Sequence, residues 1–291
     1  MPSDKWLDWI VNRRFGGDKK IAENAMVHLN EIRDKVIESA AIREGDTVLD
    51  IGTGDGFLGF AALDKVGPKG KVIFSDVSSD CVNACKEIYS SIVNPSPAEF
   101  HVASAENLSV IPNNSIDVII FRSVLIYIDN KLACFKEFHR VLKPGGRISF
   151  FEPINIFVNR HKPKNTVYGY DVTPIKDLWD KIKITAAPKD NSLDPMMNFD
   201  EDDLFRYIAE TGFVDIDMMI KAYSKRDPGI RSWEMFYQSA PNPNATSLEE
   251  VVNKSLSESE KETFISYMKP KIEGENTVRL FSEAFFTATK E

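Results

Sequence analysis

The chain has 291 residues, of which 43% are hydrophobic and 27% are charged, and its formal net charge is -8. This length can bury a full hydrophobic core, and the balance of apolar and charged residues is typical of a globular protein. The acidic net charge disfavours binding to duplex nucleic acid, because such binding depends on basic side chains that contact phosphates.

The N-terminal stretch has charges among its apolar residues, and no apolar run in the sequence is long enough to span a membrane. We therefore expect neither a signal peptide nor stable membrane insertion. Three cysteines, an odd number, predict no disulfide framework and indicate a reducing compartment, so we expect a cytoplasmic protein. We also expect no metal site, because the cysteines lack further ligands nearby. The sequence leaves the oligomeric state open.

Residues 1–44 are predicted to be helical and to form a lid. Apolar residues recur there at helical spacing, at Ile21, Ala25, Met26, Leu29, Ile32, Val36, Ile37 and Ala40. The segment "WLDWIVNRRF" before them also has the composition of a helix that lies on a membrane surface. The charge of Asp8 among the apolar residues favours the lid.

Short apolar runs then alternate with helical segments between residues 45 and 152. The runs predict strands at Thr47–Ile51, Lys71–Asp76, Glu99–Ala103, Ile116–Phe121 and Arg147–Glu152. Helices are predicted at Phe57–Val66, Ser79–Ile92 and Lys131–Leu142. Near-continuous apolar strands separated by helices indicate an α/β core, with a parallel sheet covered by helices on both faces.

The pattern loosens after Glu152, and we divide the rest of the chain by composition. Residues 153–198 are predicted to be an insertion that caps the substrate, with a helix near Ile175–Ile184. Residues 199–223 continue the core with a helix and a strand, and residues 224–276 form a helical cap insertion. Residues 277–291 supply the final core strand, which a hairpin connection would pair antiparallel with the strand before it.

The first predicted strand leads into a glycine loop, "DIGTGDGFLG". Gly52, Gly54 and Gly56 match G-x-G-x-G, a pattern of S-adenosylmethionine sites, while the same loop read from Gly54 matches G-x-G-x-x-G, a pattern of dinucleotide sites. In both cases the glycines let the backbone approach the ligand at a helix N-terminus, and the acid after the next strand, Asp76, binds ribose hydroxyls.

Two features outside the glycines favour S-adenosylmethionine. Asp50 precedes the loop at a position where a dinucleotide strand usually has an apolar residue, and its carboxylate can orient the loop and balance a cationic ligand. The segment "SAENL", Ser104–Leu108, follows the third strand and places Glu106 where an adenine amino group can donate to it.

A third feature completes a set of motifs. "VLDIGTGDG", "FSDVS", "SAENL" and "EFHRVLKPGGRISFFEP" stand in this order and together resemble the class I S-adenosylmethionine-dependent methyltransferases, most closely the branch with the ubiquinone/menaquinone C-methyltransferases. The resemblance is strong over residues 47–152. It implies a Rossmann-like three-layer sandwich with a seven-stranded, mostly parallel sheet whose last strand is antiparallel. It also implies S-adenosyl-L-methionine as cofactor, S-adenosyl-L-homocysteine as product and a small-molecule methyl acceptor.

The resemblance assigns a set of cofactor-binding residues, which are Asp50, Gly52, Gly54, Gly56, Asp76, Val77, Ala105, Glu106 and Arg122. Two departures restrict the acceptor. "FRSV" stands where methyltransferases that act on amide nitrogens of bases have an N-P-P-Y-type tetrapeptide. The cysteines fall on predicted helices and not in loops around the cleft, which disfavours arsenic as acceptor.

Arg122, Glu152 and His161 are the catalytic candidates. Arg122 ends a central strand, at the sheet edge where open α/β folds bind ligands, and its guanidinium suits a carboxylate or phosphate. An ion pair of Arg122 with Glu152, at the end of the neighbouring strand, is the structural alternative. Two other functions also fit the glycine loop: an NAD(P)-dependent oxidoreductase, and a cofactor-binding protein without catalysis.

Overall fold

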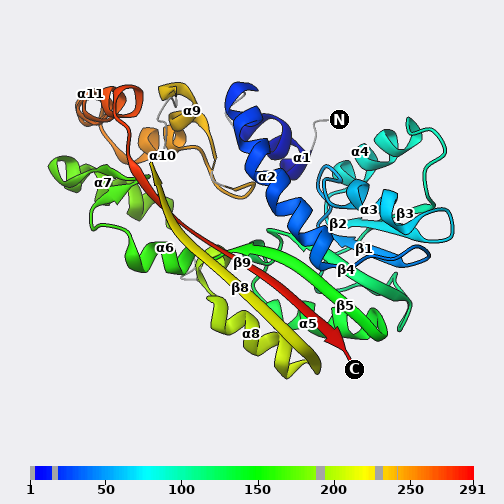
Figure 1. The fold of residues 1–291 in the computed structure, drawn as a ribbon. Coiled ribbons are helices and arrows are strands. Elements are labelled where there is room, and N and C mark those ends of the chain that lie inside the picture. The colour runs from blue at the N-terminus through cyan, green and yellow to red at the C-terminus, as the bar shows by residue number, and fades with distance from the viewer. Residues whose placement is uncertain (1–3, 15–18, 188–193, 227–231, 241) are drawn as a thin grey trace.

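The computed structural model describes residues 4–14, 19–187, 194–226, 232–240 and 242–291. Its centre is a seven-stranded sheet with the order β3-β2-β1-β4-β5-β9-β8 (Figure 1). The strands are β1 Thr47–Ile51, β2 Lys71–Asp76, β3 Ala98–Val102, β4 Ile116–Arg122, β5 Leu142–Pro153, β8 Phe213–Arg226 and β9 Val278–Lys290. Only β9, the last strand of the chain, runs antiparallel to both of its neighbours, which confirms the predicted topology.

Helices cover both faces of the sheet (Figure 1). α2 Lys19–Ser39, α3 Gly59–Val66 and α4 Ser79–Ser90 lie on one face, and α5 Lys131–Val141 and α8 Glu201–Glu210 lie on the other. Successive residues of a strand serve opposite faces, so Val48 packs with the first group and Leu49 with the second. This arrangement explains why the strands are apolar at nearly every position and lack polar alternation.

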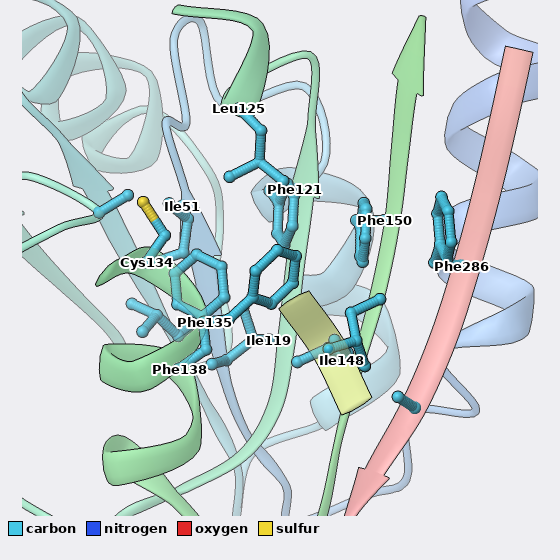
Figure 2. Packing of buried hydrophobic residues seen from close by; sticks show 14 of the residues in the cluster. Ile51, Ile119, Phe121, Leu125, Cys134, Phe135, Phe138, Ile148, Phe150 and Phe286 are labelled. Atoms are coloured by element: carbon cyan, nitrogen blue, oxygen red, sulfur yellow. The ribbon is translucent and has the colours of Figure 1, made fainter. Parts of the chain in front are cut away.

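Aromatic rings join the parallel part of the sheet to its antiparallel end. Phe121 of β4 and Phe150 of β5 stack with ring centroids 4.3 Å apart, and Phe150 stacks on Phe286 of β9 at 5.0 Å (Figure 2). All three side chains are buried, and each stacked pair adds about 0.5–1.5 kcal/mol to the energy of burial. The final strand is therefore fixed beside β5, at the edge of the candidate site.

The two insertions form one cap with a hydrophobic cluster of its own. The first insertion contributes α6 Asn155–His161, the hairpin of β6 Thr166–Val167 and β7 Tyr170–Asp171, and α7 Lys176–Ala186. The second contributes α9 Trp233–Gln238, α10 Leu248–Ser255 and α11 Glu258–Gly274. Residues of both insertions share the cluster, which includes Tyr170, Val172, Ile182, Trp233, Phe236, Val252, Phe264 and Met268.

The N-terminal region has two structural parts. α1 Lys5–Asp8 continues into a π-helix at Trp9–Arg13, whereas α2 packs on the sheet. Ser149 Oγ donates a hydrogen bond to the Val36 carbonyl of α2 at 2.8 Å, and Arg147 donates to the Ala40 carbonyl. Of the predicted lid of residues 1–44, α2 is therefore a core helix, and the described residues 4–14 remain as the lid.

Several boundaries differ from the prediction. β1 and β2 match it to the residue, β3 begins and ends one residue earlier, and β5 begins at Leu142 and not at Arg147. The early start arises because Leu142 pairs with Ile116 before the turn around Gly145. The elements α6, β6, β7 and α9 were not predicted. Among the described helices, none is long and apolar enough to cross a membrane.

Candidate active site

Two adjoining cavities lie at the carboxyl ends of β1, β2, β4 and β5, the edge where open α/β sheets bind ligands. The first cavity has a volume of about 820 Å³ and is lined by the glycine loop, the N-terminal helices and the ends of the strands. The second cavity, of about 970 Å³, lies between α2, the long β9 strand and the cap. Both cavities include a set of residues that we call the shared wall: Arg14, Arg122, Ser123, Pro153, Tyr168, Ser239 and Arg279.

The glycine loop forms the floor of the first cavity. Gly52 and Gly54 both line it, and their φ angles of +60° and +56° lie in the region that favours glycine. A Cβ atom at Gly52 would also lie 2.5 Å from a methyl group of Val124. The loop therefore leaves room for a ligand to approach its backbone, and the cofactor contact of Gly52 and Gly54 stays a prediction.

Gly56 and Gly59 serve packing within the loop. Gly56 was predicted to contact the cofactor, but it is buried and does not line the first cavity; a Cβ atom there would lie 2.3 Å from the Phe60 ring. Gly59 opens α3, where a Cβ atom would lie 2.3 Å from the Phe74 ring and 2.8 Å from an Asp50 oxygen. These two glycines let the loop fold back onto the helix.

Asp50 orients the glycine loop through hydrogen bonds at both ends of the loop. Its Oδ2 accepts hydrogen bonds from Thr53 Oγ1 at 2.6 Å and from the Gly59 amide at 2.9 Å. The side chain is buried, and desolvation raises the pKa of Asp50 to about 7 in spite of these hydrogen bonds. Asp50 lines the first cavity, so it is placed both to fix the loop and to face a cation.

Asp76 and Val77 follow β2 and line the same cavity. Asp76 accepts from the Gly54 amide and from the Ser78 amide, each at 2.9 Å, so it links the loop to the start of α4. Burial raises the pKa of Asp76. Each carboxylate oxygen has a second lone pair, so two ribose hydroxyls can still donate to this side chain.

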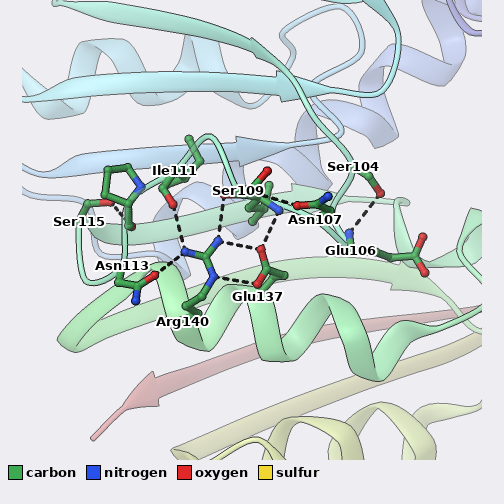
Figure 3. Close-up of polar contacts among 11 residues, drawn as sticks. Ser104, Glu106, Asn107, Ser109, Ile111, Asn113, Ser115, Glu137 and Arg140 are labelled. Atoms are coloured by element: carbon green, nitrogen blue, oxygen red, sulfur yellow. Dashed lines mark hydrogen bonds and ion pairs between the residues drawn. The ribbon is translucent and has the colours of Figure 1, made fainter.

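Ala105 and Glu106 line the first cavity on the segment after β3. The segment is anchored to α5 by Glu137, which accepts from the Leu108 amide at 2.7 Å, and by Arg140, which donates to the Leu108 carbonyl at 2.9 Å (Figure 3). The Glu106 carboxylate points away from this network (Figure 3). The side chain is exposed, and its predicted contact with the adenine amino group stays a prediction.

Glu152 has a different environment from the one predicted. Its carboxylate accepts from the backbone amides of Val124, Leu125 and Ile126 at 2.7, 2.8 and 3.4 Å, and it lines neither cavity. The side chain is fully buried, which raises the pKa of Glu152 to about 7. These contacts hold the turn that follows β4, while the predicted direct catalytic role of Glu152 stays a prediction.

Arg122 lies in the shared wall, and the alternative of an ion pair with Glu152 is not among the ion pairs of the described residues. Its guanidinium lies over the Phe57 ring, 5.8 Å from the centroid. Burial lowers the pKa of Arg122, although nearby acids such as Asp55 oppose this effect. The half-buried guanidinium is thus partly desolvated at the boundary of the two cavities.

His161 lines the second cavity only, at the end of α6. Its Nδ1 lies 2.8 Å from the Phe157 carbonyl and its ring stacks on Phe157, 4.2 Å between centroids. The structure therefore does not bring His161 to the shared wall, and its catalytic role stays a prediction. Another histidine of the second cavity, His28, lies with Nε2 2.6 Å from Oε1 of the buried Glu283.

The N-terminal helices close the first cavity. Trp6, Trp9, Ile10 and Arg14 line it, and the rings of Trp6 and Trp9 meet Tyr127 edge-on. Asp4 hydrogen-bonds to Ser78 on the core side, and Trp9 Nε1 donates to the Ala240 carbonyl of the cap at 2.9 Å. We call residues 4–14 the lid, because they connect the two sides over the cavity.

The shared wall contains strained backbone and residues that the sequence reasoning missed. Ser123 and Tyr168 have φ angles of +55° and +48°, a left-handed conformation that few non-glycine residues adopt. Arg14 and Arg279 were not predicted. Their sequence signal is weak, since Arg14 follows an apolar stretch and Arg279 is one basic residue in an apolar strand.

The three cysteines are buried and lie outside the shared wall; Cys81 lines the first cavity, and Cys85 and Cys134 line neither cavity. Burial raises the pKa of Cys81 and Cys85, on α4, to about 12, and it also raises the pKa of Cys134, on α5. Within the residues that the structure describes, no group of three or more potential metal ligands comes together.

Comparison with known proteins gives a consistent result. The model of a family described as a methyltransferase domain matches residues 42–199. The chain is 30% identical over 182 residues to an arsenite methyltransferase of Halobacterium salinarum, over 58% of this chain but only 46% of that protein. It is 28% identical over 205 residues to a ubiquinone/menaquinone biosynthesis C-methyltransferase of Escherichia coli, over 69% of this chain and 72% of that protein.

Solved structures share the fold. The YcgJ protein of Bacillus subtilis superposes with a TM-score of 0.54 and 13% identity, over 90% of this chain and 99% of that one. A protein of Bacillus halodurans superposes with a TM-score of 0.52 and 16% identity, over 89% of this chain and 98% of that one. These matches cover both the sheet and much of the chain beyond it.

Proposed function

This chain belongs to the methyltransferase domain family, and from that premise we propose that it transfers a methyl group from S-adenosylmethionine to a small organic acceptor. One observation carries the proposal. The first cavity combines the open glycine loop, Asp76 after the second strand and Glu106 after the third, at the carboxyl edge of the sheet. These are the groups that a nucleoside with a cationic tail requires.

The proposed cofactor contacts follow from this geometry. Asp76 binds the ribose hydroxyls, Glu106 accepts from the adenine amino group, and Val77 and Ala105 contact the adenine ring. Gly52 and Gly54 face the methionyl part. Asp50 and Gly56 act indirectly, since the first orients the loop and the second permits its packing against Phe60.

The reaction is an in-line displacement at the sulfonium methyl. A lone pair of the acceptor forms the new bond to the methyl carbon, the carbon–sulfur bond breaks, and its electron pair remains on sulfur as a neutral thioether. The leaving group therefore needs no proton, and alignment of acceptor and methyl is the main requirement, worth at most about 7–11 kcal/mol. The lid and the cap support this by enclosing the site and excluding water.

The shared wall is the proposed place of transfer, because it borders both cavities. Arg122 is the catalytic candidate that lies there, and it can orient an acceptor against the methyl group. Glu152 acts as a positioning residue through the turn at Val124–Ile126. His161 can serve as a base only for an acceptor that loses its proton within the second cavity.

The acceptor is proposed to be organic and small. The second cavity is large enough for a drug-sized molecule. Arsenite, the substrate named for one relative, is disfavoured because the cysteines are buried on two helices with raised thiol pKa values. Three unpaired thiols and the acidic net charge support a protein that works in the cytoplasm and does not bind duplex nucleic acid.

Calorimetry with S-adenosylhomocysteine and NADH tests the proposal. We expect micromolar binding of S-adenosylhomocysteine, about -8 kcal/mol, and none of NADH. Asp76→Ala should weaken S-adenosylhomocysteine binding by about 2 kcal/mol, because the ribose loses its acceptor, whereas Asp64→Ala, an exposed acid of α3, should not. Selective binding of NADH would point instead to an oxidoreductase. Binding of S-adenosylhomocysteine without transfer of labelled methyl to any compound in a broad screen would indicate a binding protein.

A further inference from the structure

Charges of opposite sign line the two ends of the combined site. Acidic side chains line the first cavity around the glycine loop, at Asp50, Asp55, Asp76 and Glu106. Basic side chains gather at the other end, with three arginines in the shared wall and two lysines, Lys162 and Lys183, in the second cavity. The chain carries a net charge of -8, so this basic end runs against the composition of the molecule.

The one described acid of the second cavity is already engaged. Glu283 is buried, and its Oε1 accepts from the Tyr223 hydroxyl at 2.7 Å and lies 2.6 Å from His28 Nε2. It is not part of the shared wall. The shared wall contains three arginines and no acid, and the charge of Asp55, which lines the first cavity only, acts on Arg14 and Arg122.

Arg122 can donate hydrogen bonds to an anion, although acids such as Asp55 lie near it. Among the described residues, no side-chain or backbone oxygen accepts a hydrogen bond from its guanidinium, which lies over the Phe57 ring. Burial is the main cause that lowers the pKa of Arg14 to about 10, and the charge of Arg122 adds to it. Like charges brought together away from water are unfavourable unless an anion joins them.

Arg279 completes the cluster from the opposite side, on β9. Its guanidinium lies 5.0 Å from the centroid of the Tyr168 ring and 5.2 Å from that of Phe281, so two rings fix its position. Planar guanidinium groups bind carboxylates and phosphates in two-pronged pairs. The wall thus offers fixed donors at the boundary of the cofactor cavity.

The rest of the second cavity is mainly apolar. Side chains from the sheet face, α2, α6 and the cap contribute, including Leu29, Ile32, Val158, Trp179, Ile182 and Val251. Such a lining binds a hydrocarbon or aromatic body and leaves only the wall to fix its orientation.

We propose that the methyl acceptor is an organic acid, whose carboxylate or phosphate binds between Arg14, Arg122 and Arg279 while its apolar body fills the second cavity. This inference rests on the proposed function and names its substrate class. The division of charge matches the two ligands. The acidic first cavity binds the sulfonium cation of the cofactor, and the basic shared wall binds the anionic group of the acceptor next to it. An amine with a similar body meets three positive charges and is excluded.

Four probes that each carry a ten-carbon chain test the proposal by calorimetry on the full chain saturated with S-adenosylhomocysteine. They are decanoate, decyl phosphate, methyl decanoate and decylamine, all below their micelle concentrations. We expect decanoate or decyl phosphate to bind at least tenfold more tightly than the ester and the amine. The preferred acid shows which anionic group the wall accepts. Equal binding of all four probes, or binding of none, would overturn the inference.

Arginine variants locate the binding. Arg122→Gln and Arg279→Gln should each weaken binding of the preferred acid about tenfold, with S-adenosylhomocysteine affinity changed less than twofold. Arg206→Gln, on the surface of α8 with partners Asp203 and Glu210, is the matched control and should change neither affinity. If both wall variants weaken S-adenosylhomocysteine and leave the acid unaffected, the wall holds the methionyl carboxylate and the proposal is wrong.

The same titrations without S-adenosylhomocysteine separate the two levels of inference. If the protein binds acids selectively but does not bind S-adenosylhomocysteine, the acid site is supported and the proposed methyl transfer is wrong. Tight S-adenosylhomocysteine binding without preference for acids would overturn the acid site alone.

Discussion

The first and second cavities meet at one wall, yet they are built in opposite ways. Most of the first cavity comes from turns that follow successive strands, within residues 50–128, and these turns are held by backbone hydrogen bonds to buried carboxylates. The second cavity is assembled from segments as distant as His28 and Glu283, and it is closed by apolar packing in the cap.

This difference in construction suggests that the acceptor cavity can change in sequence more easily than the cofactor cavity. In the first cavity the polar contacts that shape the site also stabilise the sheet edge, so a substitution there affects folding and binding together. In the second cavity the lining side chains belong to the cap and to one face of α2 and β9, and they can change with less effect on the sheet. Substitutions at three positions test this contrast.

Glu152 should show the largest effect, because it supports the turn between the two cavities. Glu152→Ala leaves three buried amides without their acceptor and should lower the free energy of unfolding by about 3 kcal/mol. Glu152→Gln retains one oxygen and should cost about 1 kcal/mol. Urea unfolding measures both, and Glu99→Ala, on the exposed strand β3, is the control with a change under about 0.5 kcal/mol.

Activity separates this structural role from direct catalysis. If Glu152→Gln keeps its stability and cofactor affinity but loses methyl transfer, Glu152 acts in the chemistry and the two cavities are coupled more directly than proposed.

Asp50 should make stability depend on pH. Its pKa is raised to about 7 by burial, so the folded chain holds a proton that the unfolded chain has lost above about pH 4. Stability from this group is therefore present at low pH and falls by about 1 kcal/mol per pH unit between pH 5 and 6.5. Asp50→Asn can keep both hydrogen bonds to its oxygen and should remove this fall. If the free energy of unfolding fell equally with pH in the wild-type protein and in Asp50→Asn, the assignment to Asp50 would be contradicted. The control variant Asp64→Asn should show the same fall as the wild-type protein.

Trp9 should give the smallest effect. Trp9→Phe keeps an aromatic ring near Tyr127 but removes the hydrogen bond from Nε1 to the Ala240 carbonyl, so the lid loses its contact with the cap. We expect S-adenosylhomocysteine to bind about 0.5–1 kcal/mol more weakly. Trp179→Phe, which stacks on Phe264 within the cap, should leave this affinity unchanged. Equal losses in both variants would show that the lid and cap respond as one unit.

The same contrast explains which features the sequence could predict. β1 and β2 are predicted to the residue because buried parallel strands are apolar runs bounded by glycine and acidic residues. Gly52, Gly54, Asp76 and Glu106 are predicted for a similar reason, since each lies in a short segment with its own local signal.

The shared wall could not be predicted in this way. Arg14, Arg122 and Arg279 are separated by more than 100 residues each and meet only after the lid, β4 and β9 are in place. The short elements α6 and α9 were missed because six or seven residues carry little periodicity, and the apolar side chains of α9 are buried by partners elsewhere in the chain. Local reasoning likewise assigned Gly56 to the ligand, because a glycine that avoids Phe60 has the same sequence pattern as one that faces a cofactor.

The tryptophans of the lid provide an intrinsic fluorescence signal for opening of the lid. The chain has four tryptophans, and Trp6 and Trp9 lie in the lid, against Tyr127 and at the boundary of the first cavity. Their indole rings leave an apolar, ring-lined environment whenever the lid opens. Intrinsic fluorescence should therefore shift to longer wavelength on opening and return when a nucleoside ligand closes the cavity. Stopped-flow mixing would then give the rate of lid closure without any added label.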